Sequence, residues 1–402
     1  MMSGHRPVPP SAAKGRHFLQ IPGPTNVPDR VLRAMAKPVI DHRGPEFAEL
    51  GRSVLERLKP IFRTKGHVLV FSGSGTSAWE AALVNTLAPS DRVLMVETGQ
   101  FAVLWREMAT RFGLEIDSIP TDWRRGVDPN AVEQRLKQDT RHTIKAVCVV
   151  HNETSTGAAS RIGLIRKAMD AAKHPALLLI DAVSSLGSID VRHDEWGVDV
   201  SVSCSQKGLM LPPGIGLNAV SEKALAVSKA GGSRRSFLDW QPMLKANADG
   251  FFATTPATNL LYALEEALAM FEEEGIDNVY ARHDRLAEAT RRAVAAWGLE
   301  NLCLESKDYS SVLTAVLMPD GHNADAFRKL ILDRFNMSLG MGLGKITGKV
   351  FRIGHIGEMN DLTLAGTLAG IEMGLDIAGI PHQRGGVDAA LRYLAETSRP
   401  SD

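Results

Sequence analysis

The 402-residue sequence has few cysteines, no net charge and no long hydrophobic run. Its three cysteines, Cys148, Cys204 and Cys303, stand far apart in no paired spacing, which argues against a disulfide framework or a structural zinc site. Lysine plus arginine and aspartate plus glutamate number 46 each, so no field of one sign attracts nucleic acid or an anionic membrane surface. A small-molecule partner is the better expectation, with no metal, nucleic acid or membrane.

Neither the interior nor the ends of the chain indicate a membrane or an export route. No apolar run approaches the roughly 18 residues of a membrane helix. The first residues, MMSGHRPVPPSAAKGRH, lack the apolar centre of a secretion signal, and the tail ETSRPSD is not a peroxisomal address. Residues 1–20 are expected to form a loose N-terminal arm, and the protein is expected in the cytoplasm.

The order of patterns along the chain predicts an α/β protein with two domains. From about residue 66, short apolar runs such as HVLVF and LLLID alternate with helical patterns, which is typical of parallel strands joined by crossover helices. A long helical pattern over residues 258–297 interrupts this alternation. The patterns after it predict a strand, a helix, a second strand and a second helix. We predict a large domain, 21–280, with a mostly parallel sheet covered by helices, and a smaller C-terminal α+β domain, 281–402.

A glycine-rich turn follows the first strand of this order. The sequence Ser72-Gly73-Ser74-Gly75-Thr76 opens a helix, and the unpaired N–H groups of a helix start suit a phosphate. The turn lacks the lysine of a P-loop and does not fit the dinucleotide fingerprint. An anion cradle and an ordinary strand-to-helix turn both remain open for this segment.

Two polar residues stand at the ends of other predicted strands. Asp181 follows Leu177–Ile180, in a strand expected to be buried on both faces, and a carboxylate there needs a partner. A pyridinium N–H is one such partner. The plainer alternative is that Asp181 only caps a loop. Thr154, in HNETSTG, occupies the equivalent place on a neighbouring strand, where it could also cap a helix.

Lys207 stands in SVSCSQKGLMLPPGIG, between an alternating strand and a proline-glycine turn. Alone it could be a solvated surface charge, as most lysines are. In open parallel sheets, however, ligands bind beyond the carboxyl ends of the strands, where the cradle and Asp181 also lie. A phosphate anchor, a ring-nitrogen partner and an aldehyde-trapping amine are together the parts that hold pyridoxal 5'-phosphate.

Six motifs also resemble a known family. They are PGPTNVP (22–28), SGSGT (72–76), HNETSTG (151–157), DAVSSLG (181–187), SQKGLMLPPG (205–214) and FRIGHIGE (351–358). The chain resembles, from about residue 20 to 380, the class V pyridoxal-phosphate aminotransferases of fold type I, with their seven-stranded type of sheet. Within that family it is most similar to the serine-glyoxylate and alanine-glyoxylate aminotransferases.

The resemblance implies a role for each matching residue. Lys207 would bond covalently to pyridoxal 5'-phosphate and Asp181 would pair with its ring nitrogen. The remaining cofactor contacts would come from Ser74, Gly75, Thr76 and Gln206 at the phosphate, Thr154 near the ring hydroxyl, and Phe101 stacked on the ring, where relatives carry tryptophan. Thr255 would contact the phosphate of the neighbouring subunit, because such relatives are homodimers with shared active sites.

Arg352 has two interpretations. An arginine within an apolar strand often pairs with an acid at a domain interface. The resemblance instead makes Arg352 the side chain that binds the substrate carboxylate in a bidentate manner. His42 and Arg43, in DHRGPEF, are expected near the site entrance or at the surface, without a catalytic role.

The reaction that the resemblance implies is a ping-pong transamination of amino and 2-oxo acids, with L-serine and glyoxylate giving hydroxypyruvate and glycine. Alanine, ureidoglycine and aminophosphonate donors remain open, because no partner for the serine hydroxyl is identifiable. A cysteine desulfurase is disfavoured because residues 304–351 contain no cysteine. A phosphate-ligand binding protein without turnover is disfavoured by the intact set of Lys207, Asp181 and Arg352.

Overall fold

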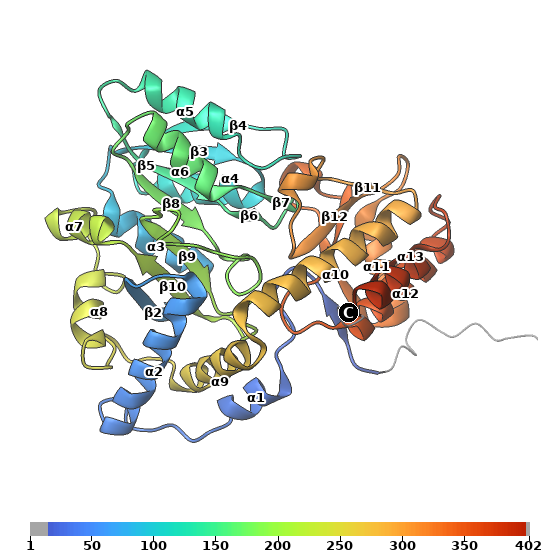
Figure 1. The fold of residues 1–402 in the computed structure, drawn as a ribbon, viewed down its shortest axis with the longest axis horizontal. Helices are drawn as coiled ribbons and strands as arrows, with labels where there is room; N and C mark the ends of the chain where they lie inside the picture. The colour runs from blue at the N-terminus through green and yellow to red at the C-terminus, as the bar shows by residue number, and fades with distance from the viewer. Residues whose placement is uncertain (1–14, 399–402) are drawn as a thin grey trace, which may run out of the picture.

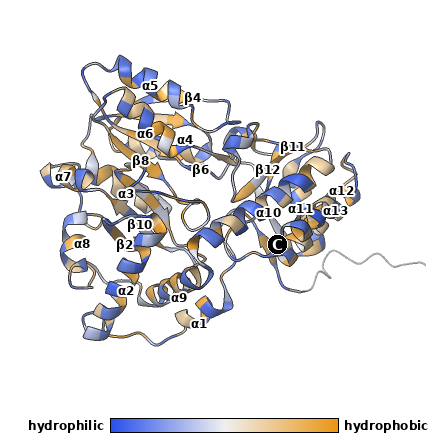
Figure 2. Ribbon diagram, viewed as in Figure 1, coloured by the Kyte–Doolittle hydropathy of each residue, from blue (hydrophilic) through white to orange (hydrophobic). Residues whose placement is uncertain are grey.

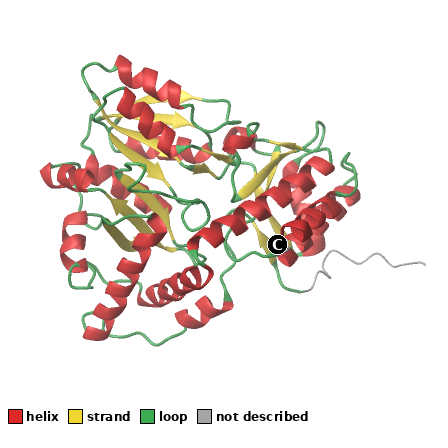
Figure 3. Ribbon diagram, viewed as in Figure 1, coloured by secondary structure: helices red, strands yellow, loops and turns green. Residues whose placement is uncertain are grey.

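The computed structural model describes residues 15–398 as two lobes, each built around its own sheet (Figure 1). Residues 1–14 and 399–402 lie outside the described chain, and with them most of the expected N-terminal arm. The larger lobe holds a seven-stranded sheet and the smaller one a five-stranded sheet. Helices lie over both sheets (Figure 3). The expected fold class, a large helix-covered sheet with a smaller α+β part, is confirmed.

The large sheet has the spatial order β2-β10-β9-β8-β5-β3-β4. Its strands are β2 (His67–Gly73), β3 (Arg92–Glu97), β4 (Glu115–Pro120), β5 (Ile144–Val150), β8 (Leu177–Asp181), β9 (Val200–Cys204) and β10 (Gly214–Val220). Only β10 runs against the others, pairing antiparallel with both β2 and β9. The carboxyl ends of β2, β5, β8 and β9 therefore lie along one edge of the sheet.

Helices cover both faces of this sheet because its strands are apolar on both faces. In β8, Leu177 and Leu179 belong to one core and Leu178 and Ile180 to another, since successive side chains of a strand point to opposite faces. The large-lobe helices are α1 (Asp29–Met35), α2 (Pro45–Phe62), α3 (Gly75–Thr86), α4 (Gln100–Arg111), α5 (Pro129–Gln138), α6 (Ile162–Ala171), α7 (Glu222–Ala230), α8 (Trp240–Asn247) and α9 (Thr258–Glu274). Outer helices such as α5 are mostly hydrophilic (Figure 2).

The small sheet includes the first strand of the described chain. Its order is β1-β13-β14-β12-β11, with β1 (Phe18–Gln20), β11 (Glu300–Asn301), β12 (Leu313–Leu317), β13 (Met337–Met341) and β14 (Val350–Gly354). The helices of this lobe are α11 (Ala324–Phe335), α12 (Asp361–Ile377) and α13 (Gly386–Thr397), with short 3-10 turns at Ser306–Asp308 and Gly344–Ile346. Because β1 pairs with β13, the chain crosses from the small sheet to the large lobe directly after Gln20.

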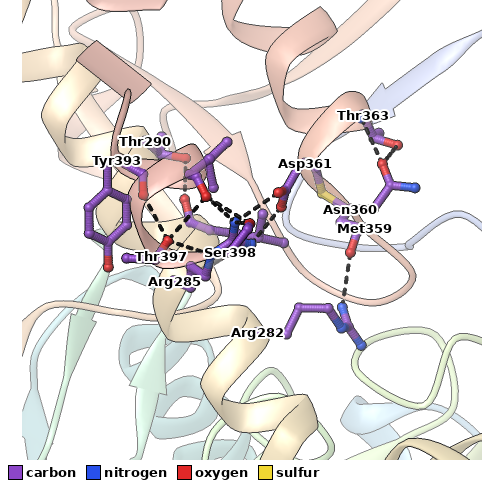
Figure 4. A network of polar contacts seen from close by, with 12 residues as sticks. Arg282, Arg285, Thr290, Met359, Asn360, Asp361, Thr363, Tyr393, Thr397 and Ser398 are labelled. Carbon is purple, nitrogen blue, oxygen red and sulfur yellow. Dashed lines mark hydrogen bonds and ion pairs between the residues drawn. The ribbon is translucent and has the colours of Figure 1, made fainter. Parts of the chain in front are cut away.

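One long helix, α10 (Ile276–Ala296), connects the lobes and is held by a polar network (Figure 4). Arg282 donates hydrogen bonds to the carbonyl oxygens of Gly357 (2.9 Å) and Met359 (3.1 Å). Arg285 pairs with Asp361 at 2.6 Å. These contacts hold the loop after β14. The expected domain boundary at residue 280 falls within α10 and stays a prediction.

Within residues 15–398 no helix combines the length and the apolar character needed to cross a bilayer. The same range contains no group of three or more histidine, cysteine, aspartate or glutamate side chains arranged to hold a metal ion.

Candidate active site

Asp181 is the last residue of β8 and lies at the edge of the large sheet where the strands end. Its Oδ1 accepts a hydrogen bond from the backbone N–H of Val183 at 2.7 Å, and its Oδ2 accepts one from the indole N–H of Trp79 at 3.0 Å. Burial raises the pKa of Asp181 to about 7. A buried carboxyl held in this way can pair with a cationic N–H.

Lys207 follows the end of β9 by three residues. Its ammonium donates to the carbonyl oxygen of Pro22 at 2.7 Å, and no carboxylate of the described chain lies within ion-pairing distance of it. Burial lowers the pKa of Lys207 to about 8. An amine with this pKa is partly neutral near pH 8 and can attack an aldehyde.

The segment after β1 packs directly on this lysine. Gly23 has φ +93°, and a Cβ atom at this position would collide with the Lys207 side chain. The charges of Lys207 and Asp181 each shift the pKa of the other, the ammonium lowering that of Asp181 and the carboxylate raising that of Lys207. The structure therefore brings these two predicted residues together, Asp181 at the end of β8 and Lys207 in the segment after β9.

The expected anion cradle joins β2 to α3. The Ser77 hydroxyl accepts from the N–H of Ser74 at 2.8 Å, which shapes the turn, and Thr76 is exposed at the helix start. A Cβ atom on Gly75 would lie 2.7 Å from Val183, so the missing side chain lets the helix start approach the loop after Asp181. The cradle and Asp181 are therefore neighbours.

Two more predicted residues border this region. The Thr154 hydroxyl donates to the Ser184 hydroxyl at 3.0 Å, in the loop that follows Asp181. Gln206 precedes Lys207, and its Oε1 is a buried atom that finds no hydrogen-bond partner among residues 15–398. Buried polar atoms are normally satisfied, so this amide oxygen needs a hydrogen-bond donor from outside the described chain.

Phe101 lies in the first turn of α4 and is partly buried. Its ring meets that of Trp79 edge-on, with the centroids 6.4 Å apart. The start of α4 is held by Glu153, which the sequence analysis assigned no role. Glu153 is fully buried, and its carboxylate accepts hydrogen bonds from the N–H groups of Phe101 (3.3 Å) and Ala102 (3.1 Å). It caps the helix from a distant part of the chain.

Arg352 lies in β14 of the small sheet and reaches the large lobe. Its Nε donates to the carbonyl oxygen of Met341 at 2.7 Å, and its Nη1 donates to that of Thr154 at 2.6 Å. No residue of the described chain accepts a hydrogen bond from Nη2. Carbonyl oxygens carry no net charge, so these contacts leave the guanidinium charge and its Nη2 donors available to a carboxylate.

Thr255 lies apart from this cluster within the described chain. It is exposed in the loop before α9 and lines a surface cavity of about 350 Å³ with His42, Arg43 and Phe252. No hydrogen bond, ion pair or ring contact described for residues 15–398 joins Thr255 to Lys207. Its predicted contact with a neighbouring subunit stays a prediction, as do the positions of His42 and Arg43 at a site entrance.

The residues present fit pyridoxal 5'-phosphate. The amine of Lys207 suits an aldehyde, the carboxylate of Asp181 suits a ring N–H, and the N–H groups at the α3 start, beside Gly75, suit a phosphate. The fold and this set of groups define the class of protein, a pyridoxal-phosphate enzyme of fold type I.

Comparison with known proteins specifies the family. A family model described as aminotransferase class-V matches residues 17–347, and the chain belongs to this family. It is 49% identical to a serine-glyoxylate aminotransferase of Methylorubrum extorquens, over 95% of this chain and 97% of that one. It is 41% identical to an L-aspartate-glyoxylate aminotransferase of Paracoccus denitrificans, over 94% and 96%. The solved pyridoxamine-pyruvate aminotransferase of Mesorhizobium loti superimposes with a TM-score of 0.89 at 28% identity, over 96% of this chain and 99% of that one.

Proposed function

We propose that this protein transfers the amino group of L-serine to glyoxylate, giving hydroxypyruvate and glycine. The observation that carries the proposal is that Lys207 and Asp181 are both buried close enough for each charge to shift the pKa of the other. Arg352 also lies near Lys207, and its Nη2 remains available to a carboxylate. The choice of substrates is supported by 46–49% identity to three serine-glyoxylate aminotransferases, each over at least 94% of this chain.

The cofactor role of pyridoxal 5'-phosphate is part of the same proposal. When bound, it supplies the electron sink that stabilises negative charge at the α-carbon of the amino acid. Its phosphate is assigned to Ser74, Gly75, Thr76 and Gln206, and its ring to Phe101, Thr154 and Asp181. Asp181 keeps the ring nitrogen protonated, because its carboxylate is buried where an opposite charge is favoured.

Lys207 has two tasks in this account. Its Nζ anchors the cofactor and, once released, accepts the proton from the α-carbon of the amino acid. A pKa near 8 suits this work, since the amine is then partly neutral at physiological pH.

Arg352 gives both substrates the same binding site. Its guanidinium takes the carboxylate of serine in one half-reaction and that of glyoxylate in the other. Glyoxylate has no side chain, so the carboxylate contact must supply most of its affinity. Shared use of one site implies ping-pong kinetics.

The preferred amino donor is tested by comparing kcat/KM for serine, alanine, aspartate, ureidoglycine and aminoethylphosphonate, each with glyoxylate. We expect the highest value for serine. A higher value for another donor would contradict the substrate assignment and leave transamination intact. If none of these donors reacts with glyoxylate, the enzyme proposal itself is wrong, and a binding protein without turnover becomes the better account.

We further propose a cytoplasmic homodimer with shared active sites. The support is the surface cavity that Thr255 lines with His42, Arg43 and Phe252, which lies apart from Lys207 in the same chain. A second chain that covers this cavity would bring Thr255 to the site of its neighbour. Light scattering of the holoenzyme should give twice the chain mass, and Thr255→Ala should weaken cofactor binding without dissociating the dimer. A monomer with full activity would contradict this proposal.

A further inference from the structure

Trp79 contacts two of the residues assigned to the cofactor, although the sequence alone assigned it no role. Its indole N–H donates to Asp181 Oδ2 at 3.0 Å. Its ring meets Phe101 edge-on, with centroids 6.4 Å apart. These two partners lie on β8 and α4, so Trp79 is a physical link between the expected ring-nitrogen partner and the expected stacking residue.

The location of Trp79 follows from the start of α3. The helix begins at Gly75, in the expected phosphate cradle, and Trp79 follows one turn later. The close approach of Gly75 to Val183 brings this first turn beside the end of β8. An indole N–H buried at this place needs an acceptor, and the carboxylate of Asp181 provides a charge-assisted one.

A second tryptophan fixes the plane of the first. Trp105 lies one helical turn after Phe101 on α4 and stacks on Trp79, with centroids 5.9 Å apart and planes inclined by 13°. The start of α4 is itself held by Glu153. Trp79 therefore has little freedom to rotate, and neither does the N–H that it directs at Asp181.

We propose that Trp79 is a positioning residue of the active site. Its N–H holds the Asp181 carboxylate in one orientation toward the cofactor ring nitrogen, and its ring supports Phe101. The inference rests on the proposed function of the same site. It assigns to Trp79 a role in cofactor binding and in the rate of proton transfer, and none in recognising the substrate carboxylate.

The chain provides a matched control. Trp105 is fully buried in the same stack, and its indole Nε1 bonds to no residue of the described chain. Trp79→Phe and Trp105→Phe each exchange a buried indole for a phenyl ring in one aromatic cluster. Only the first of them removes a hydrogen bond to Asp181.

The test compares these variants in the full-length holoenzyme and in a cycle with Asp181→Asn. We expect Trp79→Phe to weaken pyridoxal 5'-phosphate binding and to lower kcat, each by about 10- to 100-fold, the usual effect of losing one hydrogen bond to a charged group. KM for serine and glyoxylate should stay within about 3-fold. Trp105→Phe keeps an aromatic ring against Trp79 and leaves the hydrogen bond to Asp181 in place, so its cofactor affinity and kcat should change by less than about 3-fold. In the Asp181→Asn background the acceptor is at most a neutral amide oxygen, so Trp79→Phe should cost clearly less there, within about 10-fold.

Two outcomes would overturn the inference. One is a loss in Trp79→Phe no greater than that in Trp105→Phe, and the other is an unchanged cost of Trp79→Phe after Asp181→Asn. Cofactor affinity is measured by titrating the apoenzyme, so this test stands even if the wild-type protein proves inactive with serine and glyoxylate. That result would contradict the proposed function alone.

A second measurement covers the case in which Trp79→Phe does not fold. In the ¹⁵N-labelled apoenzyme, Asp181→Asn should shift the indole N–H resonance of Trp79 and leave that of Trp105 in place. Equal shifts, or none, would overturn the inference.

Discussion

The guanidinium of Arg352, in the small sheet, donates a 2.6 Å hydrogen bond to the carbonyl oxygen of Thr154, in the large lobe. The same guanidinium also bonds to Met341, beside it in the small sheet. One buried side chain therefore ties the two lobes together at the place assigned to the substrate carboxylate. The alternative interpretation of Arg352, an ion pair across the interface, does not describe its contacts, because both acceptors are neutral carbonyl oxygens.

Arg352→Ala should raise KM for serine and glyoxylate together, by about 100-fold, because a bidentate charged contact is lost in both half-reactions. Steady-state kinetics with each substrate varied in turn measures this. Arg328→Ala is a matched control, since Arg328 also donates to a small-lobe carbonyl, that of Leu339 at 2.8 Å, and has no assigned substrate. An increase in KM for only one substrate would contradict a shared carboxylate site.

Asp181→Asn should keep the fold and lower kcat by about 100- to 1,000-fold, because a neutral amide does not hold a proton on the ring nitrogen. Asp199→Asn is the control. Asp199 is equally buried and precedes β9, where its Oδ2 accepts from the N–H of Leu178 at 2.9 Å. Activity of Asp181→Asn close to that of the wild type would remove Asp181 from its assigned role.

Lys207→Met should stabilise the apoenzyme against urea at pH 7, by about 1–3 kcal/mol, because it removes a buried ammonium that lacks an acid. The pKa of Lys207 is about 8 in the folded chain against an ordinary 10.5, so above pH 8 the unfolded chain binds more protons. Wild-type stability therefore gains from this group as pH rises from about 8 to 10.5, and the advantage of the variant should shrink over that interval. If the stability difference between Lys207→Met and the wild type did not change with pH, burial would not destabilise the Lys207 ammonium, and the prediction would be wrong.

Glu153→Ala should lower the stability of the apoenzyme by about 2–4 kcal/mol, because the first N–H groups of α4 lose their acceptor inside the protein. Gly99→Ala should have a similar effect, since a Cβ atom there would collide with Glu153. Both are measured by urea unfolding. Ala109→Gly, at a buried position near the far end of the same helix, is the control, and it should cost about 1–2 kcal/mol through helix propensity and the loss of one buried methyl group. Losses no larger than this control would contradict the capping role.

The strands and the residues at their ends could be predicted because the evidence for them is local. Asp181 follows an apolar run, and Lys207 stands in an irregular segment after an alternating one, so each position is defined by neighbours in sequence. The same reasoning did not find that β10 runs antiparallel, since an apolar strand has the same composition in either direction. The pairing of β1 with β13 joins residues more than 300 positions apart and leaves no local pattern.

The supporting residues of the site were missed for the same physical reason. Trp79 belongs to a regular apolar stripe, and its N–H finds Asp181 only because α3 packs beside β8. Glu153 lies within the motif HNETSTG, but its acceptor role depends on the start of α4, with Phe101 lying 52 residues earlier. A side chain that acts through a tertiary contact carries no signature in its own segment.

The central claim is that one particular amine, among all the lysines of the chain, carries the cofactor. Borohydride reduction of the holoenzyme, followed by peptide mass spectrometry, records which lysine has gained the pyridoxyl phosphate group. The account predicts one modified peptide, containing residue 207, and no cofactor fixed to a Lys207→Ala variant. Label on a different lysine, or equal labelling of that variant, would contradict it.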